Sequence, residues 1–250
     1  MKIGIIGTGA IGGTIAKKMV STGHQVKVTN REELDKLQNI ALEFGALPSS
    51  LIDVVKNVDV VILSIPTISI LDLPKDLFNG VPENLIVVDT TNYYPFRDGE
   101  IEELKSGTVE SEWVAKQIGR PVIKAFNNLL AYSLEHGGKP EGDKERIAMA
   151  ISGDDENAKA IVSALVNDAG FDSVDAGFLS ESWTHQPGTP AYCTELNIFE
   201  LTQALPNAIK EVSAHIRDTS LSELMNLTEP THQDIVEFLR SLFSKSPKLS

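Results

Sequence analysis

Short apolar runs and amphipathic stretches alternate from the start of the chain. Lys2–Ile6 is an apolar run of strand length, and Ile11, Ile15 and Met19 then recur at helical spacing. A second short apolar run, Gln25–Thr29, follows. This pattern predicts a strand, a helix and a parallel strand, so the chain opens with a βαβ unit.

The same alternation continues through the first half of the chain. Val58–Pro66 is apolar on both faces, as expected of a strand at the centre of a parallel sheet. The other expected elements are strands at Ala46–Pro48, Leu85–Asp89 and Pro121–Phe126 and helices at Leu51–Asn57 and Glu110–Ile118. Strands that alternate with helices in this way predict an α/β fold with a doubly wound, mostly parallel sheet.

A glycine turn joins the first strand to the first helix. The residues Gly7-Thr8-Gly9-Ala10-Ile11-Gly12 form a G-x-G-x-x-G motif inside the βαβ unit. The first glycine allows the tight turn, the second leaves room for a pyrophosphate, and the third allows close packing of helix on strand. Free backbone N–H groups at the helix start suit an anion. We therefore predict that these six residues bind a dinucleotide in an NAD(P)-binding Rossmann-type domain.

The end of the second strand distinguishes NADP from NAD. NAD-binding domains usually place an acidic residue there, which accepts a hydrogen bond from the ribose 2′-OH. This chain has Asn30 and Arg31, a neutral donor and a guanidinium that suit a 2′-phosphate. The alternative is that Arg31 only pairs with Glu32, Glu33 or Asp35 on an exposed helix start. We predict NADP as the cofactor, with Asn30 and Arg31 at its 2′-phosphate.

Ligands of doubly wound sheets bind beyond the carboxyl ends of the strands. Ser64, Ile65 and Pro66 end the central strand, so we expect them along the nicotinamide ribose. Tyr93, Tyr94 and Trp183 either form an aromatic wall for a ring substrate or pack in the core.

A further βαβ pattern follows the predicted core at residues 1–126. It comprises a helix, a strand, a helix and a strand at Leu129–Glu135, Arg146–Ser152, Asp154–Asp168 and Phe171–Ala176. This extension, residues 127–184, either widens the sheet or forms a small domain beside it. We assign residues 1–184 to the Rossmann-type domain.

Residues 185–250 are expected to form a loop over the cleft and a helical C-terminal segment. Trp183–Pro190 is too rich in glycine and proline for regular structure. Helical patterns dominate from Glu195 onward, and Thr231 with Asp234 resembles a capping box. The apolar stripe that follows packs either on its own domain or on a second subunit, in which case the protein is a homodimer.

Composition excludes several classes of partner. Lys and Arg number 22 against 35 Asp and Glu, and the net charge of −13 repels nucleic acids and anionic membranes. The longest apolar run, Val58–Leu71, is interrupted by polar residues and proline, and the N-terminus lacks a signal-peptide pattern, so we expect a cytoplasmic protein. The single cysteine, Cys193, excludes an intrachain disulfide and a cysteine metal site, and we expect no metal.

Four segments together resemble the NADP oxidoreductases that depend on the deazaflavin coenzyme F-420. They are Gly7–Gly12, Asp89–Pro95, Lys124–Asn127 and Gln186–Pro190. The resemblance covers residue 1 to about residue 205. It implies an NADP(H) site and an open cleft in which a flavin or deazaflavin exchanges hydride. It also implies that Ala125 and Asn127 approach the nicotinamide and its partner, and that Asn30 and Arg31 occupy the place of the family's Ser-Arg pair.

No residue is assigned a catalytic role, because hydride transfer between planar rings requires stacking rather than an acid. The leading hypothesis is an NADP-dependent oxidoreductase with a flavin-like small-molecule acceptor. A reductase of a small carbonyl or imine is an alternative, with His185 or Lys124 as proton donor, although His136 and His185 lie in loops and are expected to face solvent. A non-catalytic protein that senses NADP is the third.

Overall fold

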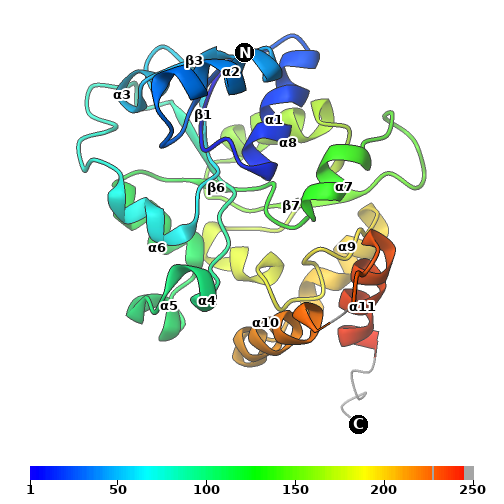
Figure 1. The fold of residues 1–250 in the computed structure, drawn as a ribbon. Coiled ribbons are helices and arrows are strands. Elements are labelled where there is room, and N and C mark those ends of the chain that lie inside the picture. The colour runs from blue at the N-terminus through cyan, green and yellow to red at the C-terminus, as the bar shows by residue number, and fades with distance from the viewer. Residues whose placement is uncertain (227, 245–250) are drawn as a thin grey trace.

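The computed structural model describes residues 1–226 and 228–244. Its centre is a six-stranded parallel sheet in the order β3-β2-β1-β4-β5-β6 (Figure 1). The strands are β1 (Lys2–Ile6), β2 (Gln25–Thr29), β3 (Leu47–Pro48), β4 (Val60–Leu63), β5 (Ile86–Asp89) and β6 (Ile123–Lys124). This order is that of a doubly wound Rossmann fold, so the fold class predicted from the sequence is confirmed.

Helices cover both faces of the sheet because its central strands bury both faces. Val60 and Ile62 of β4 belong to one apolar cluster, and Val61 and Leu63 belong to the other. The helices of this part are α1 (Ala10–Ser21), α2 (Leu34–Phe44), α3 (Leu51–Val54), the 3₁₀ helix η1 (Thr67–Asp72), α4 (Pro95–Asp98), α5 (Glu102–Lys105), α6 (Glu110–Ile118) and α7 (Ala131–His136). Successive side chains of a strand point to opposite faces, so continuous apolar runs are required here.

Strand β6 is shorter than the expected Pro121–Phe126. Pro121 has no N–H to donate to a neighbouring strand, and Phe126 has a φ of +59°, which ends extended structure. The chain therefore leaves the sheet just after Lys124 and turns toward the carboxyl edge.

The extension forms a sheet of its own rather than a simple continuation. Strands β7 (Ala148–Ile151) and β8 (Asp172–Asp175) pair in parallel, with α8 (Glu156–Asp168) between them in sequence. One antiparallel bridge joins this pair to the main sheet: Lys124 N–H donates to Ser152 O at 2.8 Å, and Ser152 N–H donates to Lys124 O at 3.0 Å. Residues 127–184 thus do not simply widen the main sheet. They contain a small second sheet, which one bridge joins to the main sheet.

The C-terminal segment is helical, as expected. It contains the 3₁₀ helix η2 (Leu179–His185), α9 (Ile198–Ala204), the 3₁₀ turn η3 (Leu205–Asn207), α10 (Lys210–Met225) and α11 (His232–Ser244). Helices α9, α10 and α11 gather at the lower right of Figure 1, away from α2 at the top. The expectation that Trp183–Pro190 lacks regular structure is wrong for Trp183 to His185, which complete η2. The predicted capping box is present, since Thr231 N–H donates to Asp234 Oδ2 at 2.8 Å.

Gly188 allows the backbone of α10 to contact the loop that follows η2 directly. Its φ is +87°, and a Cβ at this position would lie 1.9 Å from the Ser213 carbonyl oxygen. The backbone of α10 therefore rests directly on Gly188, which explains a glycine at this place in the Gln186–Pro190 segment.

A buried polar network ties β5, β6 and α6 together below the carboxyl edge. The Lys124 ammonium, fully buried, pairs with Asp89 at 3.1 Å and donates to the Thr91 carbonyl oxygen. Asp89 also accepts from the Ser111 hydroxyl at 2.6 Å. Beside them, Glu110 accepts from the Tyr93 N–H at 3.0 Å. A buried charge requires such partners, so this network fixes the loop after β5.

Burial raises the pKa of the Glu110 carboxyl to about 7, against the pull of the nearby Lys124 charge. The folded chain therefore holds this proton to a higher pH than the unfolded chain, and wild type loses stability as pH rises from about 4.5 to about 7. Glu110→Gln removes this loss, so its unfolding free energy relative to wild type increases between about pH 5 and about pH 8. Urea unfolding at both pH values tests this, with the exposed Glu112→Gln as control; an unchanged difference contradicts it.

Candidate functional site

The glycine turn has the geometry that its residues predicted. Gly7 has a φ of +109°, and a Cβ there would lie 2.0 Å from the Ser64 carbonyl oxygen. A Cβ on Gly12 would lie 2.1 Å from the Gly7 carbonyl oxygen. A Cβ on Gly9 would meet no atom within 4 Å. The outer glycines are thus required by packing, whereas Gly9 leaves open space above the start of α1.

The start of α1 is prepared for an anion. Gly9 is the N-cap residue and offers no side chain to the first N–H groups, and the first turn contains no acidic residue. The backbone donors and the helix dipole are therefore available to a phosphate. Ala10 is exposed beside this turn and Thr8 and Ile11 are half-buried, and the role of the three residues in binding a pyrophosphate stays a prediction.

A pocket of about 350 Å³ lies beside the end of β2 and is lined by Gly7, Asn30, Arg31, Ile65, Pro66 and Asp72 among others. Asn30 Nδ2 donates to the Thr8 hydroxyl at 2.7 Å, which links β2 to the glycine turn. Asn30 Oδ1 accepts from the Glu32 N–H at 2.9 Å. Asn30 is therefore fixed in place, with its amide already engaged.

Arg31 is exposed at the rim of this pocket and pairs with Asp72 of η1. It does not pair with Glu32, Glu33 or Asp35. The alternative that Arg31 pairs with one of these three residues is therefore wrong. A guanidinium at this rim suits a 2′-phosphate, but the Asp72 carboxylate competes for the same donors.

A second space of about 350 Å³, the cleft, lies over the carboxyl ends of β1, β4, β5 and β6. It is lined by Gly9–Ile11, Ser64–Pro66, Thr90–Asn92, Tyr94, Arg97, Phe126, Asn127, Leu129–Ala131, Tyr192 and Cys193. Ile65 and Pro66 line both spaces, so the two spaces lie next to each other along the end of β4. Ser64, Ile65 and Pro66 thus line the cleft after the central strand, and their place along the nicotinamide ribose stays a prediction.

Asn127 lies in the cleft at the centre of a hydrogen-bonded cluster. Its Nδ2 donates to Asn92 Oδ1 at 3.1 Å and to the His185 carbonyl oxygen at 2.9 Å. Asn92 Nδ2 in turn donates to the Asn127 carbonyl oxygen at 2.9 Å. Ala125, in contrast, is fully buried in the core, and its neighbour Phe126 lines the cleft instead.

His185 is fully buried, so the expectation that it faces solvent is wrong. Its ring lies 3.0 Å from Asn127 Oδ1 and 2.9 Å from the Ser152 hydroxyl. Burial, together with the Lys124 charge, lowers the pKa of His185 to about 3. The neutral ring therefore positions Asn127, and neither His185 nor Lys124 lines the cleft.

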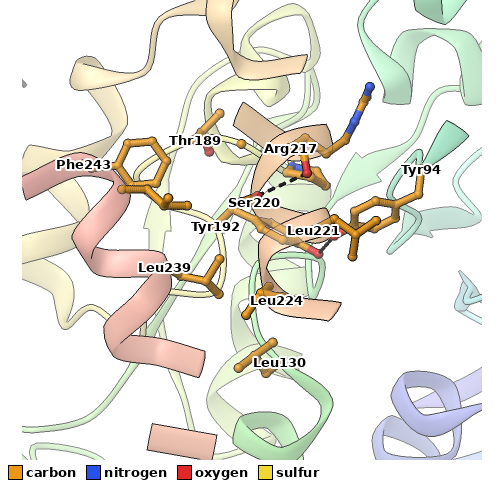
Figure 2. Close-up of a pocket in the computed structure, with 13 residues that line it drawn as sticks. Tyr94, Leu130, Thr189, Tyr192, Arg217, Ser220, Leu221, Leu224, Leu239 and Phe243 are labelled. Atoms are coloured by element: carbon orange, nitrogen blue, oxygen red, sulfur yellow. Dashed lines mark hydrogen bonds between the residues drawn. The ribbon is translucent and has the colours of Figure 1, made fainter. Parts of the chain in front are cut away.

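Two tyrosines line the cleft, only one of which was predicted. The Tyr94 hydroxyl lies 2.7 Å from the Tyr192 hydroxyl, and burial raises the pKa of both phenols (Figure 2). Tyr93 packs in the core, with its hydroxyl donating to the Gly99 carbonyl oxygen at 2.9 Å, and Trp183 does not line the cleft. Tyr192 comes just after the Gln186–Pro190 segment, and that segment was the signal in the sequence that pointed to this region. The pairing of Tyr192 with Tyr94, 98 residues earlier, leaves no local pattern in the sequence.

The lone cysteine is a packed side chain rather than a nucleophile. Cys193 is buried, and burial raises the pKa of its thiol to about 12. Within residues 1–226 and 228–244, no three His, Cys, Asp or Glu side chains are grouped so as to hold a metal ion. None of the helices in the same part of the chain is long and apolar enough to cross a membrane.

Two glycine substitutions separate binding from stability. Gly9→Ala places its Cβ in open space where the pyrophosphate approaches, so it weakens NADPH binding by about tenfold or more and leaves stability nearly unchanged. Gly12→Ala forces a clash with backbone and lowers the unfolding free energy by about 1–3 kcal/mol. Fluorescence titration with NADPH and urea unfolding measure the two effects; an unstable Gly9→Ala protein contradicts the assignment.

Arg31 and Asp72 have opposite effects on cofactor choice. Arg31→Ala removes charged hydrogen bonds of about 1.5–3 kcal/mol and weakens NADPH binding by roughly ten- to a hundredfold. Asp72→Asn frees the guanidinium and strengthens NADPH binding severalfold. Titrations with NADPH and NADH measure both variants. If NADH binding changes by the same factors, Arg31 does not recognise the 2′-phosphate.

The comparisons with known proteins agree with this geometry. Residues 2–93 match the sequence model of the family described as NADP oxidoreductase, coenzyme F420-dependent. Protein YjhV of Escherichia coli (strain K12) is 37% identical over 110 residues, which cover 44% of this chain and 80% of that protein.

Solved structures extend the similarity beyond the family match. The hypothetical protein SMa0349 from Sinorhizobium meliloti is 30% identical, with a TM-score of 0.66 over 79% of this chain and 95% of that chain. A protein assigned as an F420-dependent NADP reductase from Arthrobacter sp. FB24 shares the fold, with 23% identity and a TM-score of 0.59 over 73% of this chain and 87% of that chain. The predicted cofactor, NADP, is confirmed by the family. The chain belongs to the coenzyme F420-dependent NADP oxidoreductase family and is an NADP-dependent oxidoreductase.

Proposed function

We propose that the protein passes hydride between NADP(H) and a flavin or deazaflavin acceptor that stacks in the cleft. The observation that carries this proposal is the open cleft itself, which offers Ile65, Phe126 and Leu129 to a flat ring and no carboxylate, histidine or lysine. Ring-to-ring transfer requires distance control and the exclusion of water, which such side chains supply. When bound, NADPH supplies the hydride, and a solvent proton completes the two-electron reduction of the acceptor.

Different residues of the chain position different parts of the two ligands. The free N–H groups at the start of α1 hold the pyrophosphate, and Arg31 holds the 2′-phosphate. Asn92 and Asn127 hold each other at the floor of the cleft, with the side-chain N–H groups of both residues bonded within the protein. Because His185 fixes Asn127 from below, these amides are pre-organised before any ligand arrives.

Reduction of a small carbonyl or imine is a second candidate, and one observation supports it. The two donors expected for it, His185 and Lys124, are fully buried and engaged. The paired hydroxyls of Tyr94 and Tyr192, however, line the cleft and offer an alternative proton donor. An NADP sensor requires a cleft closed to a second ring, whereas this cleft is open.

Stopped-flow mixing of the protein with NADPH and deazaflavin, FMN, FAD or riboflavin tests the proposal. We expect loss of nicotinamide absorbance only when an acceptor is present, with a reduced rate at low NADPH for Arg31→Ala. The matched control is Glu33→Ala, an exposed neighbour outside the pocket beside β2. Should none of the four acceptors oxidise NADPH, the proposal is wrong. Turnover of an imine that is lost in Tyr94→Phe then favours the second candidate.

A further inference from the structure

Arg97 of α4 brings a positive charge to the edge of the cleft. Among the described residues that line the cleft, it alone has a charged side chain, and 39% of that side chain is exposed. The chain as a whole is acidic, with 35 Asp and Glu against 22 Lys and Arg. A guanidinium at this place is therefore a local exception to the charge of the molecule, and an anion in the cleft meets it without a competing carboxylate on the lining.

The guanidinium is held rigidly by the segment from Asn92 to Asp98. Its Nε donates to Asp98 Oδ1 at 3.0 Å, and its Nη2 donates to Asp98 Oδ2 at 2.8 Å. Nη2 also donates to the Asn92 carbonyl oxygen at 2.6 Å, and the guanidinium carbon lies 5.5 Å from the centre of the Tyr94 ring. The Asp98 side chain is fully buried and accepts from the Tyr94 N–H at 3.0 Å. The guanidinium is thus positioned before any ligand binds.

One nitrogen of Arg97 is left for a ligand. Nη1 carries two N–H groups and makes no hydrogen bond within residues 1–226 and 228–244. Because the other two nitrogens are engaged, the two-nitrogen fork that grips a carboxylate is not available. A terminal oxygen of a phosphate suits the remaining nitrogen. Asp98 balances the charge on the buried side, so this contact is a local charged hydrogen bond rather than a long-range attraction.

The topology separates Arg97 from the predicted pyrophosphate site. That site lies at the start of α1, which follows β1, whereas α4 follows β5. In the sheet order β1-β4-β5 these two strands are two places apart, or about 10 Å at the usual strand spacing. Arg97 thus comes from the β5 side of the cleft, away from the helix that is prepared for the phosphates of the cofactor.

We propose that Arg97 binds, through Nη1, a phosphate group on the side chain of the acceptor. The protein then selects phosphorylated acceptors over neutral ones. Among flavins it favours FMN over riboflavin, which has the same ring system without the phosphate. This inference rests on the proposed function, because it places the acceptor in the same cleft. It concerns the side chain of the acceptor rather than its ring, so it applies to flavins and deazaflavins alike.

A comparison of FMN with riboflavin tests the contact. In wild type we expect a KM for FMN roughly tenfold lower than that for riboflavin, as for one partly exposed charged hydrogen bond. Arg97→Gln raises the KM for FMN to that for riboflavin and leaves the KM for riboflavin and the Kd of NADPH unchanged. The matched control is Lys105→Gln, which removes a positive charge from the exposed face of α5, outside the cleft, and retains the preference for FMN.

Competition by inorganic phosphate tests the same contact in wild type, without a substitution next to the buried Asp98. At saturating NADPH, phosphate is expected to raise the KM for FMN and to leave the KM for riboflavin unchanged. Equal KM values for the two flavins in wild type overturn the inference. An Arg97→Gln protein that loses affinity for both flavins, or for NADPH, to the same extent overturns it as well, because such losses indicate a structural role or a contact with the cofactor.

Binding without turnover separates this inference from the proposed function. Quenching of flavin fluorescence by the complex of the protein with NADP⁺ measures the Kd of each flavin. If FMN binds more tightly than riboflavin through Arg97 but NADPH reduces neither flavin, the proposed function is wrong and the phosphate site remains. If NADPH reduces both flavins and Arg97→Gln changes neither KM, the inference is wrong and the proposed function remains. If neither flavin binds, both are wrong.

Discussion

The Lys124 ammonium, fully buried beneath the cleft, must be neutralised where water cannot reach it. Asp89 supplies the countercharge and the Thr91 carbonyl oxygen a further acceptor, so the end of β5 and the loop after it are fixed to β6. The backbone of Lys124 also bridges to Ser152, which ties the small sheet to the large one. Asn92 and Asn127 follow closely after these fixed strand ends, so their positions and the geometry of the cleft depend on the Lys124 network.

Local patterns were sufficient for the half of the molecule that holds the cofactor. The glycine turn, the strands on either side of it and the two-faced apolar run of β4 are determined by residues close in sequence, and each was predicted. The position of Arg31 at the end of β2 follows from the same βαβ unit. Such features require only periodicity and backbone geometry, which a sequence displays directly.

The cleft and the rim of the pocket beside β2 depend on pairings between distant segments, and there the sequence was a weaker guide. His185 was expected in solvent because its neighbours include glycine and proline, yet Asn127 and Ser152 surround it. Tyr192 meets Tyr94 across the cleft, and Asp72 meets Arg31 from η1, although neither pairing leaves a periodic signal. Burial of a polar side chain is decided by partners that only the fold assembles.

Gly188 gives the C-terminal helices an unusual kind of attachment. Because α10 rests on this glycine through the backbone at Ser213, any side chain at position 188 would collide with the backbone of the helix. A single position in the loop after η2 therefore sets how closely α10 approaches that loop, through a contact made by backbone atoms rather than by side-chain packing.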